Sequence, residues 1–198
     1  MTCHPVRRNL TLKVMQKRQT NQLRKGRVSL SDARYFITMC AVRPESRLTE
    51  PVVSHAIRLA LEQSVPNKDF VLLCASLMPD HVHLLIRLSQ RLSVGQVVGK
   101  LKYLTRKSMT DTGCRWQANF FEHRLRPDEM ASPYALYIFL NPYRKGIIQR
   151  DACWPFWIQG PADFDFTVHL HDGKYPPVQW ITSDLDALGI TANHLGQD

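Results

Sequence analysis

The stretch FVLLCASLMPDHVHLLIRL, residues 70–88, decides the fold. Two apolar runs of strand length lie on either side of Met78-Pro79-Asp80. Proline and aspartate favour turns, so the stretch predicts two neighbouring strands with a bend between them. Successive side chains of a strand point to opposite faces, which places His81 and His83 on the same face. Two imidazoles in that position can bind one metal ion.

The elements on either side follow from hydrophobic spacing and from helix-ending signals. We expect strands at 35–42, 70–77, 82–88 and 120–125, and helices at about 50–63, at 93–109 with Ser93 as N-cap, and from after Pro127 to Asn141-Pro142. The order predicts an α+β, ferredoxin-like (split βαβ) antiparallel sheet with helices on one face and an appended C-terminal helix. Both histidines then lie on a central strand and face either the open sheet surface or the appended helix.

The bulk composition is that of one globular domain with extensions. The chain has 198 residues, of which 44% are hydrophobic and 22% charged. Its apolar runs are of strand length, and no signal-type stretch follows the first residues, so we expect a cytoplasmic protein without a membrane span. The five cysteines are scattered without a CxxC pair, which argues against a disulfide framework or a thiolate zinc site.

The net charge of +9 is distributed unevenly along the chain. Residues 1–34 contain nine basic side chains and one acidic, whereas residues 147–198 contain two basic and seven acidic. We therefore divide the chain into a basic arm (1–33), a central domain (34–146) and an acidic extension (147–198), whose tryptophans should pack on the domain. A basic arm can bind a phosphate backbone, and the alternatives are a solvated tail or a membrane-surface contact. The candidate contacts in the arm are Arg7, Arg8, Lys25 and Arg27.

A second pair of residues completes a possible reaction centre. Tyr137 and Asn141 are four residues apart in the last predicted helix, so a phenol and an amide oxygen share one helix face. With a metal ion on the histidines, the chain would hold a nucleophile and a Lewis acid. Taken alone, each signal has a structural alternative: the histidines can be hydrogen-bonded core residues, and Tyr137 can be a core aromatic. The rival nucleophiles are Tyr103, Tyr134 and Tyr143.

Four stretches together carry a resemblance to a known family. LMPDHVHLL at 77–85 resembles the HUH motif of the single-tyrosine transposases of insertion sequences and their REP-associated relatives. WQANFFEHR at 116–124, YIFLNPYR at 137–144 and WPFW at 154–157 are similar to motifs of the REP-associated branch. The similarity covers about residues 34–158, with the motifs in the expected order.

The resemblance implies a role for each matching residue. His81, His83 and Asn141 would be metal ligands and Tyr137 the catalytic nucleophile. The ion would be Mg²⁺ or Mn²⁺, although the softness of the ligands alone does not exclude zinc. Asp80 fits a turn or a support for the ligands better than a ligand.

The implied reaction is cleavage of single-stranded DNA near a hairpin-forming palindrome. A phenol has a reference pKa near 10, so its attack at neutral pH needs deprotonation or metal assistance. The product would be a 5'-phosphotyrosine with a free 3' hydroxyl, and attack by a second 3' hydroxyl would reverse the step without ATP. Whether the chain acts as a monomer or a dimer stays open.

Further DNA contacts are predicted outside the centre, namely Lys102, Arg106, Trp116, His123 and Arg124. The alternatives are a solvated helix face for the first two and an edge-strand packing cluster for the others.

Two rival functions remain. The first is a regulator that binds single-stranded or hairpin nucleic acid on the same fold without catalysis. The second is a zinc hydrolase built on the histidine pair, which lacks a clear third ligand.

Overall fold

The structure is a computed structural model that describes residues 28–42, 47–64, 66–160, 164, 166 and 176–182. The predicted arm contacts at Arg7, Arg8, Lys25 and Arg27 lie outside these residues. The strands are β1 (Arg34–Cys40), β2 (Phe70–Leu77), β3 (His81–Leu88), β4 (Phe121–Arg124) and β5 (Trp157–Gln159), and the helices are α1 (Pro51–Ser64), α2 (Val94–Asp111), α3 (Ser132–Arg144) and α4 (Val178–Thr182). No helix in the described ranges is long and apolar enough to cross a bilayer.

The strands form one antiparallel sheet in the order β4-β1-β3-β2-β5. The first four strands have the order of a split βαβ unit, which confirms the predicted ferredoxin-like α+β fold. β3 lies in the middle of the sheet and pairs with β1 on one side and β2 on the other. The histidine strand therefore has hydrogen-bonded neighbours along its whole length.

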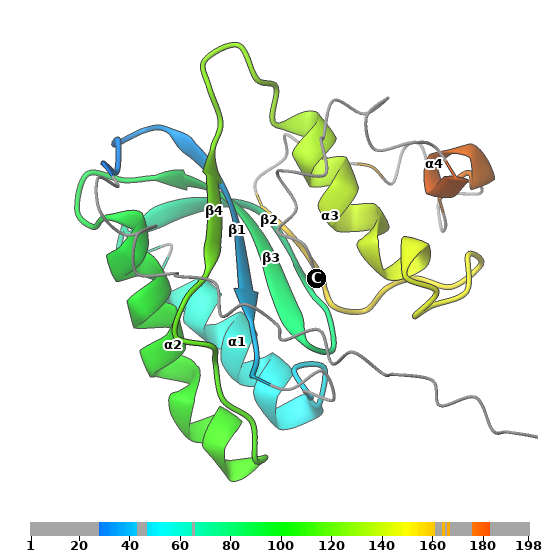
Figure 1. Cartoon of the computed structure of the whole chain (residues 1–198), viewed down its shortest axis with the longest axis horizontal. Coiled ribbons are helices and arrows are strands. Elements are labelled where there is room, and N and C mark those ends of the chain that lie inside the picture. The colour runs from blue at the N-terminus through cyan, green and yellow to red at the C-terminus, as the bar shows by residue number, and fades with distance from the viewer. Residues whose placement is uncertain are drawn as a thin grey trace, which may run out of the picture.

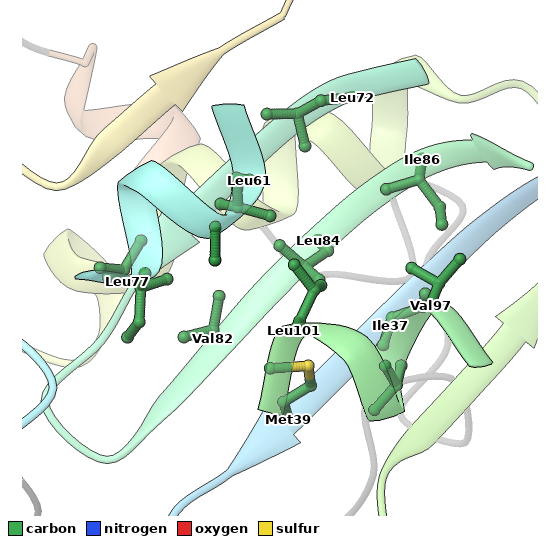
Figure 2. Packing of buried hydrophobic residues seen from close by; sticks show 14 of the residues in the cluster. Ile37, Met39, Leu61, Leu72, Leu77, Val82, Leu84, Ile86, Val97 and Leu101 are labelled. Carbon is green, nitrogen blue, oxygen red and sulfur yellow. The ribbon is translucent and has the colours of Figure 1, made fainter. Parts of the chain in front are cut away.

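Helices cover both faces of the sheet (Figure 1). α1 and α2 pack on one face, where Leu61 and Leu101 meet Leu84 and its neighbours on β3 (Figure 2). α3 packs on the other face, where Ile138 and other residues meet Phe36 and Leu85. Because side chains alternate along β3, the even-numbered positions face α1 and α2 and the odd-numbered positions face α3.

A β-bulge changes this alternation in β2. The register with β3 shifts between Leu72 and Cys74, so one extra residue is inserted. Leu72 faces α1 and α2, and so does Ala75, three residues later. Ser76 is therefore turned to the α3 face, directly opposite His83 in the register.

The N-terminus of α2 confirms the predicted cap. The Ser93 side chain accepts a bond from the Gln96 backbone N–H, and the Gln96 side chain accepts one from the Ser93 N–H. This reciprocal capping box satisfies two donors that helix geometry leaves without partners.

Both predicted ends of α3 were wrong. The helix begins at Ser132 instead of just after Pro127, because Glu129 holds the intervening residues in a turn and accepts the Arg126 backbone N–H at 2.6 Å. The helix also continues through Pro142 to Arg144. Proline removes one helical hydrogen bond and disfavours helical geometry before it. Burial of Asn141 and Tyr143 offsets that cost, and the Lys145 N–H still donates to the Asn141 carbonyl at 3.0 Å.

The sequence did not predict β5. It is only three residues long and pairs with the free edge of β2, opposite Cys74 to Ser76. The packing on the domain that we expected of the tryptophans is found for Trp157, whose ring lies 5.2 Å from that of Phe139 on α3. The Trp154 ring lies 5.2 Å from that of Phe156, within the extension itself. The side chain of Trp180 lies outside the described part of the structure.

Candidate metal and nucleophile site

The site begins with two imidazoles on the α3 face of β3. His81 and His83 are both buried, with exposed fractions of 5% and 2%. Their Nε2 atoms face each other at 3.0 Å. Strand geometry alone brings them together, as the two-residue spacing predicts.

The Nδ1 atom of each ring has its own partner. The His81 Nδ1 lies 2.7 Å from a carboxylate oxygen of Asp80, and the His83 Nδ1 lies 2.9 Å from the hydroxyl of Thr38 on β1. An ionised carboxylate only accepts hydrogen bonds, so the His81 Nδ1–H donates to it. The same bond holds the pKa of Asp80 below its usual value. When the His83 Nδ1–H likewise donates to Thr38, both Nε2 lone pairs point into the site.

α3 supplies two more side chains. The Asn141 amide Nδ2 lies 3.3 Å from the His83 Nε2. The Tyr137 ring lies 5.4 Å from the His83 ring, centroid to centroid, with the planes at 65°. Both side chains are buried, and the four-residue spacing puts them on the same helix face as predicted. The structure thus brings together the four residues predicted to form the centre.

The surroundings keep His83 neutral. Phe36 stacks on its ring at 5.4 Å and also packs edge-on against Tyr137 at 6.0 Å. Burial, with smaller electrostatic contributions from the neighbouring His81 and Lys145, holds the pKa of His83 well below its usual value. A neutral imidazole is the form that binds a metal ion.

Two observations indicate that a divalent cation fits here. Two neighbouring ligands of an octahedral ion with bonds of about 2.1 Å are about 3 Å apart, which matches the spacing of the two Nε2 atoms. The Asn141 Oδ1 is buried and has no hydrogen-bond partner in the described part of the chain. A 180° rotation of the amide would exchange Nδ2 and Oδ1 and present that oxygen to the same point. No three His, Cys, Asp or Glu side chains of the described residues gather as a metal site, so the amide is the natural third donor.

Sequence reasoning missed several residues around the centre. Thr38 and Phe36 come from β1, and only the strand register shows that they flank His83. Ser76 is fully buried opposite His83, and its hydroxyl has no hydrogen-bond partner among the residues described. Because of the bulge in β2, the alternation of side chains along the strand does not predict this placement.

Three of the predicted DNA contacts are held by the protein itself. The Lys102 ammonium donates to the backbone carbonyls of Gln117 and Asn119 at 2.8 and 3.0 Å. The Trp116 indole N–H donates to Thr105 on α2 at 2.8 Å. Lys102 and Trp116 therefore fix the segment between α2 and β4, on the side of the sheet opposite the histidines.

His123 belongs to another cluster, near the start of α3. Its Nε2 lies 3.0 Å from the Glu129 carboxylate, and its ring stacks on that of Tyr134 at 5.5 Å. Burial, with Glu129 nearby, raises the pKa of Tyr134 to about 12. Arg106 and Arg124 are exposed, and neither is brought to the histidines.

Comparisons with known proteins find relatives of this chain. Residues 29–125 match the family described as "Transposase IS200 like", a range that contains β1 to β4 and both histidines but ends before α3. A Haemophilus influenzae protein named "Putative REP-associated tyrosine transposase" is 26% identical over 140 residues, which cover 62% of this chain and 77% of the relative.

One solved structure shares the fold. It is that of a REP-associated tyrosine transposase bound to a REP hairpin, with a TM-score of 0.57 and 20% identity, covering 66% of this chain and 79% of that chain.

Proposed function

Because residues 29–125 match the family of IS200-like transposases, we propose that this chain cuts and rejoins single-stranded DNA with Tyr137 as nucleophile and His81, His83 and Asn141 as metal ligands. The observation that carries the proposal is the position of the Tyr137 ring, 5.4 Å from the His83 ring. The tyrosine and the imidazole pair come from elements far apart in sequence. Among the described residues, the predicted catalytic side chains meet at this site alone.

The ion we propose is Mg²⁺ or Mn²⁺. It would be held by the two Nε2 atoms and the Asn141 Oδ1, and when bound it would polarise the scissile phosphate and stabilise the charge that develops there. Thr38 and Asp80 orient the imidazoles from behind, at Nδ1.

The covalent step belongs to Tyr137. Its phenol loses a proton and the phenolic oxygen attacks the phosphorus, while the bond from phosphorus to the 3' oxygen breaks and that oxygen takes up a proton. The product is a 5'-phosphotyrosine and a free 3' hydroxyl. Because one ester replaces another, a second 3' hydroxyl can attack the phosphotyrosine and release Tyr137.

The proposed substrate is a hairpin formed by a repetitive palindrome. The names of the relative and of the solved hairpin complex support this choice, as does the basic character of the chain. We also propose that the basic arm at 1–33 binds DNA and that the protein acts in the cytoplasm.

The experiment is to incubate the full chain with labelled single-stranded hairpin DNA and Mn²⁺, and to look for a complex that resists denaturation. The wild type should form it, and Tyr137→Phe should not, although it should bind the DNA with the same affinity. Tyr103→Phe is the matched control, because Tyr103 is 74% exposed on α2.

Two outcomes would count against the assignment. Adducts that persist in Tyr137→Phe would move the role to another tyrosine. Tight binding by the wild type without any adduct would favour the regulator that binds without catalysis.

A further inference from the structure

A basic groove lies at the end of the sheet where β3 ends and β2 begins. Its volume is about 460 Å³, and its lining includes Lys68, Arg87 and Arg91 with a single carboxylate, Asp32. Lys68, Arg87 and Arg91 are all exposed. The groove is therefore cationic and open to an anion from solvent.

Arg87 has no charge partner among the residues described. No hydrogen bond or ion pair of its guanidinium is found there, and the residue opposite it in β1 is Arg34. Like charges directly opposite each other on neighbouring strands destabilise a sheet. Arg34 turns toward the loop before α3, where its guanidinium donates to the Glu129 carbonyl at 3.0 Å. Arg87 is left on the sheet, close to the other two cations.

The two turns that form the walls have fixed and costly backbone geometry. Asp32 and Lys68 have φ of 61° and 55°, and they are the two non-glycine residues with positive φ in the described part of the chain. Such conformations cost free energy and are found preferentially at functional sites. The Asp32 N–H donates to the Leu88 carbonyl at 2.8 Å, and the Arg91 guanidinium donates to the Asn67 carbonyl. The walls are thus set before any ligand binds.

The groove includes a residue on the same face of the sheet as the histidines. Arg87 is an odd-numbered residue of β3, as His83 is, so both side chains leave the strand on the α3 face. The two residues are four positions apart along the strand, a distance of about 13 Å. Leu85, which lies between them, is covered by α3, so a DNA strand with its scissile phosphate at the histidines would pass around the helix and place a phosphate a few nucleotides away at Arg87.

We propose that this groove binds a backbone phosphate of the single-stranded DNA that flanks the cleavage point, with Arg87 and Lys68 as the contacting residues. The proposal deepens the proposed function and depends on it. The guanidinium and the ammonium would bind the non-bridging oxygens of one phosphodiester, a contact that is independent of base sequence.

The test measures binding without chemistry. Labelled hairpin DNA with single-stranded extensions is titrated with the full chain in EDTA, at several salt concentrations. The variants are Arg87→Gln and Lys68→Asn, since asparagine tolerates the left-handed backbone at that turn. The charge-matched control is Arg58→Gln on α1, on the opposite side of the sheet. We expect Arg87→Gln to raise the Kd roughly tenfold and to reduce the slope of log K against log salt by about 0.7, with the control close to wild type.

A second measurement locates the contact. A neutral methylphosphonate replaces each phosphate of the extensions in turn. At one linkage the replacement should weaken binding by wild type but not by Arg87→Gln, because the variant has already lost that contact. If every linkage affects both proteins equally, or if Arg87→Gln binds like the control, the proposal is wrong. Adduct formation by the wild type is scored separately, so failure of the catalytic assignment is distinguishable from failure of the groove.

Discussion

The Nε2 atoms of His81 and His83 face each other at 3.0 Å while the Nδ1 atoms of both rings are bonded on the opposite side. With both Nδ1 atoms protonated, two lone pairs point at one another inside the protein. A cation between them removes that repulsion, so binding of a divalent ion should stabilise the fold as well as assist the reaction.

The amide oxygen of Asn141 gives the first prediction. Asn141→Leu should weaken Mn²⁺ binding by at least about tenfold, whereas Asn141→Asp, which keeps an oxygen at the same position, should retain binding. The affinity is measured by calorimetry or by the rise of Tm on adding Mn²⁺. Equal affinity of the leucine variant and the wild type would remove Asn141 from the ligand set.

Thr38 gives the second prediction. Thr38→Val keeps the shape of the side chain but removes the partner of the His83 Nδ1, so the ring loses its fixed orientation and tautomer. Affinity for Mn²⁺ should fall by about 10- to 100-fold. Thr105→Val is the matched control, because its hydroxyl is buried on the α2 side of the sheet and bonds the Leu101 carbonyl. A similar loss of affinity in both variants would show that the effect is not specific to His83.

The third prediction concerns pH. The pKa of His83 is lowered well below its usual value in the folded protein, while the unfolded chain takes up a proton near pH 6.5. Below pH 6.5 the unfolded state binds one proton more than the folded state. The contribution of His83 to the free energy of unfolding is therefore fully present above pH 6.5 and is lost as the pH falls, by up to about 1.4 kcal/mol per pH unit.

Chemical denaturation in EDTA between pH 5 and pH 7 measures this slope. His83→Gln should flatten it, whereas His55→Gln on the exposed side of α1 should not. A wild-type slope that His83→Gln leaves unchanged would contradict the burial argument.

Gly160 gives the fourth prediction. A Cβ on this residue would lie 2.0 Å from the Leu72 carbonyl oxygen, so Gly160→Ala should displace β5 from β2 and lower the free energy of unfolding by about 1–3 kcal/mol. Gly99→Ala is the opposite case, because a Cβ there meets nothing within 4 Å and alanine favours a helix. That variant should gain up to about 1 kcal/mol. Thermal and urea unfolding of the two variants measure these changes in the free energy of unfolding. An equal effect of both substitutions would contradict the contact at β5.

The sequence was sufficient for those parts of the centre that depend on local geometry. His81 and His83 share a face because of the two-residue period of a strand, and Tyr137 and Asn141 because of the helical period. They meet because the histidines face the appended helix, which is one of the two arrangements that the sequence left open. The role of each residue in catalysis remains a prediction.

The remaining features of the fold and of the centre depend on strand pairing and tertiary packing, which no local sequence pattern contains. Thr38 reaches His83 only through the register of β1 with β3, and Ser76 does so only through the bulge in β2. α3 runs past Pro142 because tertiary burial outweighs one lost hydrogen bond, which a propensity rule does not include. β5 is too short to give a periodic signal, and it lies beyond the boundary that we placed at residue 146.

The connections of α3 have a consequence for how rigid the centre is. The helix follows β4, at one edge of the sheet, and leads to β5, at the other edge, so it spans the sheet between two hydrogen-bonded ends. A single copy of the chain therefore brings the Tyr137 phenol, the Asn141 amide and the two imidazoles together. Of the two edge strands that flank the helix, β5 pairs with its neighbour at three positions and β4 at four, so β5 is the easier one to release when the tyrosine moves away from the imidazoles.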